Sequence, residues 1–198
     1  PPLVLDAAEL QVLARRPVWR VGAVRGLPLL NQFEPDGTHS GVAAEATEQV
    51  ARRLGVGLQV VGFDNVGAML DALRRGEIDL VPFLTRTPER EREFAFSQPY
   101  VEMPYVIVAR TDAPLYYSLD SLQGRSLALA LQHPLRPLLL QRHPGIRLVD
   151  VADGSEALNA VSDGRADAAV EVKLFANLRI NADGLDRLRT VAAVDEVP

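Results

Sequence analysis

A pattern of helix, glycine, two further residues, aspartate and strand occurs twice in this chain, and it constrains the fold more than any other feature. The first copy is Ala72–Asp79 (ALRRGEID) and the second is Ala160–Asp167 (AVSDGRAD). Strands that alternate with helices favour a mostly parallel sheet with crossover helices. The repeat therefore predicts two similar α/β lobes, although ordinary loop chemistry between a helix and a strand can also produce such a likeness.

Hydrophobic periodicity and turn residues predict the elements of both lobes. An N-terminal helix is expected up to about Arg16, because Asp6 and Glu9 have the spacing of a capping box. Residues 25–40 are expected to form a loop rich in turn signals. The expected strands are 19–24, 58–61, 78–83, 105–109, 127–131, 146–151, 168–172 and 188–194, and the expected helices are 42–54, 66–75, 134–142, 155–162 and a stretch up to about 178.

Composition excludes several classes of function. The formal net charge of -5 argues against nucleic acid or an anionic membrane as the main partner. The chain has no cysteine, so disulfides, thiolate catalysis and cysteine zinc sites are excluded. His39, His133 and His143 lack the spacing of metal ligands, and we expect neither a metal nor a cofactor. No apolar run approaches the ~20 residues that a membrane-spanning helix needs.

The stretch Gly76–Tyr100 carries the clearest candidate for a binding site. Thr87 and Pro88 form a helix start, with Arg90 one turn further on. Unpaired backbone N–H groups, the helix dipole and a planar guanidinium all favour an anion at one point. The alternative interpretation is that TRTPERERE is a solvated run of charges.

The run T-R-T-P-E-R followed by F-A-F-S-Q-P-Y resembles the signature of the type II periplasmic solute-binding proteins, in the polar amino-acid binding family. The resemblance covers nearly the whole chain and implies a bilobed Venus flytrap fold with two α/β lobes joined by a hinge. It also implies that Arg90 clamps the carboxylate of a ligand, helped by Thr85. Phe83, at the end of the preceding strand, is assigned to the same site.

The resemblance also implies a domain organisation: an N-terminal linker helix over residues 1–17, a first lobe over 18–109 and a second lobe over 110–198, with the hinge near Val108. Flytraps of this family continue for several tens of residues, so the first lobe is expected to lack its C-terminal return segment. The abrupt ends at Pro1-Pro2 and Glu196–Pro198 suggest a fragment of a longer protein.

Departures from the family pattern concern the ligand. The acidic positions that hold an ammonium group in amino-acid binders fall on Ala23 and Val172, and Glu171 is one residue early, on the opposite face of its strand. An ammonium group buried without a partner would cost several kcal/mol. The usual aromatic platform is replaced by Gly26–Leu29. In the second lobe, Gln132 and His133 stand where a Gly followed by Thr or Ser is usual, and both can still donate hydrogen bonds.

Three functions remain open at this point. The first is a periplasmic ligand-sensing domain of a BvgS-like hybrid sensor histidine kinase in the inner membrane, involved in virulence regulation and binding a small organic carboxylate, for which nicotinate is one example. Its partners would be neighbouring flytrap or kinase domains of the same chain, or a second copy in a homodimer. The second is the solute-binding subunit of an ABC uptake transporter for amino acids or related carboxylates. The third, a cyclohexadienyl dehydratase-like enzyme, would need an acid or base in the cleft, and only His133 and Glu171 are candidates. Because no other acid or base is placed for such chemistry, we expect no catalytic residue in this domain.

Overall fold

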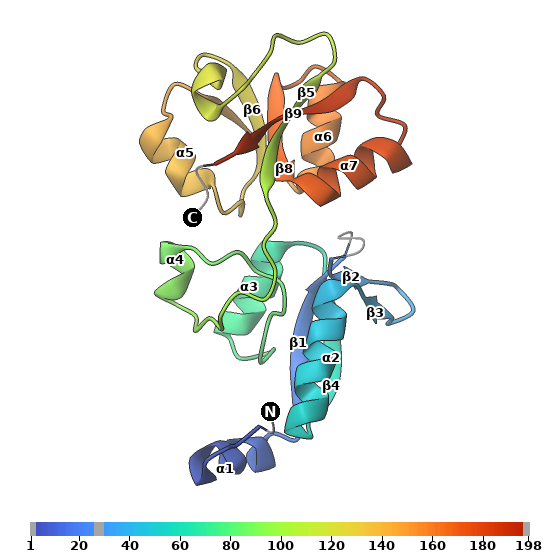
Figure 1. Ribbon diagram of the computed structural model, residues 1–198, viewed down its shortest axis with the longest axis vertical. Helices are drawn as coiled ribbons and strands as arrows, with labels where there is room; N and C mark the ends of the chain where they lie inside the picture. Colours follow the sequence, from blue (N-terminus) through green and yellow to red (C-terminus); the bar gives the residue numbers. More distant parts are fainter. Residues whose placement is uncertain (1–2, 26–29, 196–198) are drawn as a thin grey trace. The chain divides into compact units, whose positions relative to one another are not determined.

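The chain divides into two compact units, Pro1–Thr85 and Arg86–Pro198, in a computed structural model that describes residues 3–25 and 30–195 (Figure 1). The first unit contains α1 (Ala7–Arg15), β1 (Val18–Val24), β2 (Gln32–Phe33), β3 (His39–Ser40), α2 (Val42–Leu54), β4 (Gly57–Phe63) and α3 (Val66–Arg74). The antiparallel pair of β2 and β3 lies in the segment that was expected to be loop throughout. None of the helices in the described part of the chain is long and apolar enough to cross a bilayer.

The first unit is built on the parallel pair of β1 and β4. Helix α3 begins at Asn65, whose side chain caps the helix by accepting from the N–H of Ala68, and it buries Met69 against Val24 and Ile78. Helix α1 has the predicted capping box, with Asp6 and Glu9 each accepting from the backbone N–H of the other, but it contains no buried residue.

The predicted strand over 78–83 is wrong. Leu80 makes only an isolated parallel bridge to Val21. The N–H groups of Asp79 and Leu80 both donate to the carbonyl of Arg20, and the carbonyl of Leu80 accepts from the N–H of Gly22, so the pairing is limited to this one bridge. Pro82 then removes a backbone donor, which favours the end of pairing over its continuation.

The second unit contains α4 (Pro88–Glu91), β5 (Tyr105–Arg110), the short 3₁₀ helix η1 (Leu119–Leu122), β6 (Ser126–Ala130), α5 (Arg136–Arg142), β7 (Arg147–Val151), α6 (Gly154–Ser162), β8 (Ala168–Val172), α7 (Lys173–Ala182) and β9 (Leu188–Val194). Its five-stranded sheet has the order β7-β6-β8-β5-β9. Strand β6 is parallel to β7 and β8, whereas β5 is antiparallel to β8 and β9. Strand β5 thus belongs to the second sheet, and the lobe limits 18–109 and 110–198 stay a prediction.

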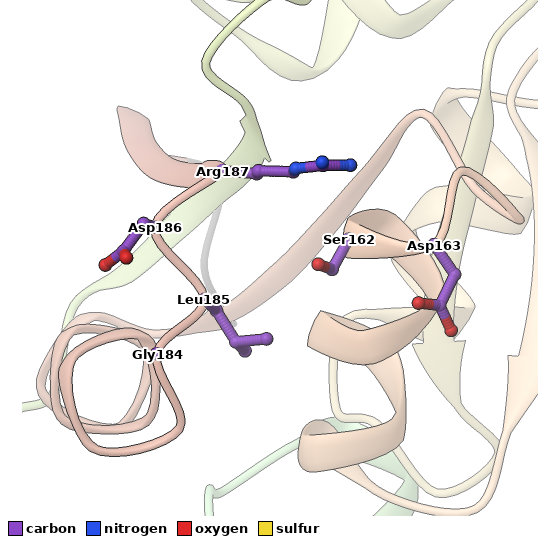
Figure 2. A pocket seen from close by; sticks show the side chains of 6 residues that line it. All are labelled: Ser162, Asp163, Gly184, Leu185, Asp186 and Arg187. Carbon is purple, nitrogen blue, oxygen red and sulfur yellow. The ribbon is translucent and has the colours of Figure 1, made fainter.

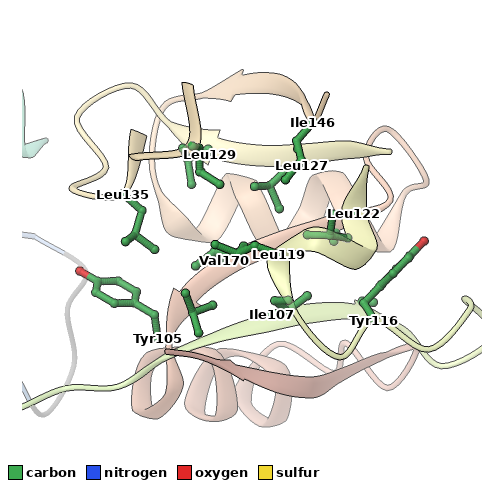
Figure 3. Close-up of a cluster of buried hydrophobic side chains, with 14 residues drawn as sticks. Tyr105, Ile107, Tyr116, Leu119, Leu122, Leu127, Leu129, Leu135, Ile146 and Val170 are labelled. Carbon is green, nitrogen blue, oxygen red and sulfur yellow. The ribbon is translucent and has the colours of Figure 1, made fainter. Parts of the chain in front are cut away.

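One large apolar cluster fills the face of this sheet that η1 and α5 cover, while α6 and α7 lie together on the other face (Figures 1 and 3). Ile107, Leu127 and Val170 are fully buried in the cluster, and Val172 packs against its edge. Because side chains alternate along a strand, Ala169 and Glu171 face the α6 and α7 side.

The repeat seen in the sequence is present in the structure. Gly76 and Gly164 adopt φ angles of 67° and 77°, in the left-handed region that glycine enters without steric cost. Three residues later, the carboxylate of Asp79 accepts from the N–H of Arg20 at 2.8 Å, and that of Asp167 accepts from the N–H of Ser126 at 2.8 Å. In each unit the repeated aspartate therefore forms a hydrogen bond with an earlier strand, which is β1 for Asp79 and β6 for Asp167.

Candidate functional site

Arg90 lies on a single helical turn whose start the sequence predicted correctly. Thr87 is the N-cap and accepts from the N–H of Arg90 at 3.3 Å, and Pro88 occupies the first helical position. The half-buried guanidinium donates through Nη2 to the carbonyl of Gln132 at 3.0 Å. Burial lowers the pKa of Arg90, while Tyr105 and Glu89 oppose the shift. An arginine with a lowered pKa still carries its positive charge at physiological pH.

His133 follows β6 and is held by two backbone turns. Its N–H donates to the carbonyl of Ala130 at 3.0 Å, and its carbonyl accepts from the N–H of Arg136 at 3.1 Å. The side chain is 8% exposed, and its ring meets the ring of Tyr105 edge to face with centroids 5.2 Å apart. Burial, together with the charges of Arg90 and Arg136, lowers the pKa of His133 to about 3. The imidazole is therefore neutral at neutral pH.

The hydrogen bonds of His133 also fix its tautomer. Nδ1 accepts from the N–H of Leu135 at 3.2 Å, so the proton of the neutral ring is on Nε2. Nε2 is buried and has no hydrogen-bond partner within residues 3–25 and 30–195. A buried N–H without a partner is rare in folded proteins and needs an explanation. Here it leaves a donor beside the guanidinium of Arg90, an arrangement that suits an anionic acceptor.

Three of the five predicted ligand residues, namely Arg90, Gln132 and His133, come together in the second unit. The side chain of Gln132 is exposed, and its backbone carbonyl is the group that receives Arg90. Phe83 and Thr85 belong to the first unit and are both half-buried, and their part in the site stays a prediction.

Sequence reasoning missed Tyr105, whose ring packs against His133. The signal was weak, because Tyr105 is simply the first residue of a β-prone run. The expected orientation of Glu171 was correct: a Cβ added at Gly154, in the first turn of α6, would lie 2.6 Å from its Oε1. Ala23 is fully buried and Val172 is apolar, so neither expected ammonium position carries a charge. Gly26–Leu29, which were expected to replace the aromatic platform of the family, lie outside the described residues.

A separate hollow of about 400 Å³ lies at the carboxyl end of α6 and the turn before β9 (Figure 2). It is lined by Ser162, Asp163, Gly184, Leu185, Asp186 and Arg187, which include none of the predicted site residues. Asp163 and Arg187 are exposed, so this hollow is a polar surface feature and not an extension of the Arg90 site. The described residues contain no group of three or more His, Cys, Asp or Glu that could hold a metal ion.

Comparison with known proteins matches this fold to one family. The model for bacterial extracellular solute-binding proteins, family 3, matches residues 20–174. The virulence sensor protein BvgS of Bordetella bronchiseptica is 33% identical over 193 residues, which are 98% of this chain and 16% of that protein. The crystal structure of the Bordetella pertussis BvgS periplasmic VFT2 domain has a TM-score of 0.87 at 32% identity, and the match covers 98% of this chain and 83% of that one.

A histidine kinase sensor domain with similarity to periplasmic binding proteins matches with a TM-score of 0.84 and 26% identity, over 91% of this chain and 78% of that one. These matches confirm the resemblance and the flytrap fold predicted from the sequence. They are to sensor domains, in agreement with the expectation that this domain is not an enzyme. The chain belongs to the bacterial extracellular solute-binding proteins of family 3 and has the fold of a Venus flytrap domain.

Proposed function

We propose that this chain is the periplasmic ligand-sensing domain of an inner-membrane sensor histidine kinase, and that it binds a small organic carboxylate. Its similarity to the BvgS VFT2 domain over 98% of its length supports the sensor part of the proposal. Neighbouring flytrap or kinase domains of the same protein would then be its partners, with residues 1–17 as the link to them.

The unpartnered Nε2–H of His133 beside the guanidinium of Arg90 supports the ligand part of the proposal. A carboxylate could accept from both groups and would give the buried donor its missing partner. Gln132 would add donors from the same loop, and Thr85 and Phe83 would add a hydroxyl and a ring from the first unit.

The ligand is proposed to lack a required ammonium group, because the two positions that would hold one are Ala23 and Val172. An aromatic monocarboxylate such as nicotinate has the carboxylate that the site would bind and lacks an ammonium group. It offers one carboxylate to Arg90 and His133 and buries an aromatic ring that carries no charge near neutral pH.

Equilibrium binding of nicotinate, nicotinamide and a matching α-amino acid to the full-length protein tests the proposal. Charge-assisted hydrogen bonds contribute about 1.5–3 kcal/mol each, so Arg90→Ala should weaken nicotinate binding by roughly 10- to 100-fold. Arg86→Ala is the matched control, because Arg86 is exposed and paired with Glu91. Equal affinity for acid and amide, or equal effects of the two substitutions, would contradict the carboxylate clamp.

The second candidate is a solute-binding subunit of an uptake transporter, which the general description of the family favours. The parent gene separates the two. A transmembrane segment and a kinase domain after this chain would select the sensor, and a signal peptide directly before a free flytrap would select the transporter subunit.

A further inference from the structure

Glu171, near the end of β8, is a buried acid that the proposed ligand site does not use. It is 8% exposed, and its carboxyl packs against Gly154 at the start of α6 and close to the ring of Phe175 in α7. A Cβ at Gly154 would lie 2.6 Å from Glu171 Oε1 and 2.8 Å from Phe175 Cε1. Glycine is therefore needed at this position so that the carboxyl and the ring can approach the helix. We call Gly154, Glu171 and Phe175 the Glu171 junction.

The charged groups around the junction do not neutralise a carboxylate. From α6, the nearest is the N-cap Asp153, which has the same sign. Glu156 accepts from the N–H of Ala152 at 2.7 Å and lies 3.7 Å from Arg165. From α7, Lys173 is exposed, and from β5 the residue paired with Glu171 is the apolar Val106. No cation forms an ion pair with Glu171 in the part of the chain that the structure describes.

Burial, together with the charge of Asp153, raises the pKa of Glu171 to about 8, against the opposing effect of the Val172 N–H. This value agrees with the packing, because an ionised carboxylate without water or a counter-ion is strongly disfavoured in such a place. For the ionised side chain to be hydrated, it must move away from Gly154 and Phe175. Such a movement requires the first turns of α6 and α7 to separate locally.

We propose that the Glu171 junction is a proton-operated joint, which closes around the protonated side chain and opens when the proton is released. Opening is thus linked to pH, in the range between the ordinary pKa of a glutamate and that of the closed junction. In a domain exposed to the periplasm, this range includes the pH changes of the surroundings.

The joint is connected to the candidate ligand site through β5. Val172, next to Glu171, is paired with Tyr105, and the ring of Tyr105 packs against His133. A shift at the end of β8 would therefore move Tyr105, whose ring packs against the imidazole of His133. This connection rests on the proposed function, whereas the joint itself does not.

Hydrogen–deuterium exchange of the full-length protein between pH 5.5 and 9 tests the joint, with protection factors corrected for the intrinsic exchange rates. Protection of peptides from 154–162 and 173–182 should fall by up to about tenfold per pH unit below pH 8 and level off above it. Glu171→Gln keeps the shape of the neutral side chain and cannot ionise, so its protection should not depend on pH in this range.

Asp153→Asn is the second variant, because asparagine keeps a capping oxygen but removes the charge. The pKa of Glu171 should then fall, so that protection levels off at a lower pH than in the wild type. A wild-type protein whose protection does not change with pH would overturn the proposal. An unchanged pH dependence in Glu171→Gln would also overturn it. Neither outcome depends on a ligand, so the result is independent of the carboxylate clamp.

Discussion

His133 shows what a sequence can and cannot establish at the scale of a residue. Its position after the first strand of the second lobe identified it as a candidate donor. Its ring packs against Tyr105, which lies 28 positions away in the sequence, and its Nδ1 accepts from the N–H of Leu135, which leaves the buried Nε2–H without a partner in the described residues. A tautomer is determined by such contacts and cannot be deduced from the residue type alone.

Replacing His133 by Phe should weaken the binding of a carboxylate such as nicotinate by about tenfold or more, since a donor to a charged acceptor is lost. The phenyl ring can keep the contact with Tyr105, so the loss should appear in affinity. His143→Phe provides a matched control, because His143 is a buried histidine of the same unit that lies beside Asp120. Isothermal titration calorimetry would measure both. If the two variants bound equally well, His133 would not be a ligand contact.

At the scale of elements, most helices and strands followed from periodicity and turn residues. The helix Val42–Leu54 and the strands Ala168–Val172 and Leu188–Val194 have the predicted limits. The failures have a physical cause in the surroundings of the chain. The segment after Ile78 is β-prone, but its donors converge on Arg20 and Pro82 offers no N–H, which are properties of pairing and not of local preference.

The two repeated glycines allow a test of the repeat at the scale of an element. Gly76→Ala and Gly164→Ala each force a side chain into the left-handed region, at a cost of about 1–2 kcal/mol. Among the described residues, neither site has a close steric neighbour: nothing lies within 4 Å of a Cβ at Gly76, and at Gly164 the nearest atom is Arg110 Nη1 at 3.8 Å. The cost should therefore be mainly conformational and similar at the two sites.

Two sets of chromophores can report the two units separately. The only tryptophan, Trp19, is in β1 of the first unit. All four tyrosines follow Arg86 and therefore belong to the second unit. Urea denaturation should show that Gly76→Ala destabilises the transition seen by tryptophan fluorescence and Gly164→Ala the one seen by tyrosine near-ultraviolet dichroism. If each variant shifted both transitions equally, the units would unfold as one.

At the scale of the whole molecule, titration should affect the two units differently. In the first unit, hydrogen bonding to Arg20 lowers the pKa of Asp79, so stability is present above the ordinary pKa and is lost as pH falls. In the second unit, His133 likewise makes stability fall as the pH decreases. Its folded pKa of about 3 lies below the ordinary 6.5, so the unfolded chain binds the extra proton and stability falls as pH decreases from about 6.5.

Only the second unit should also lose stability on the alkaline side. The folded pKa of Glu171, about 8, lies above the ordinary 4.5, so between these values the folded state holds a proton that the unfolded state has released. By itself, Glu171 would lower the free energy of unfolding by about 1.4 kcal/mol for each pH unit in that interval. From pH 4.5 to 6.5 the opposite slopes of His133 and Glu171 offset each other, which predicts a plateau followed by a decline up to about pH 8.

Urea denaturation of the 198-residue chain at pH 5, 6, 7, 8 and 9 would measure this profile with the same two chromophores. The tyrosine-reported transition should weaken between pH 6.5 and 8, while the tryptophan-reported one stays nearly constant over that range. Glu171→Gln should remove the alkaline decline and leave the loss of stability at acid pH, because a neutral amide occupies the same space without a proton to lose. An alkaline decline that persists in this variant, or one that appears equally in the first unit, would mean that another group controls it.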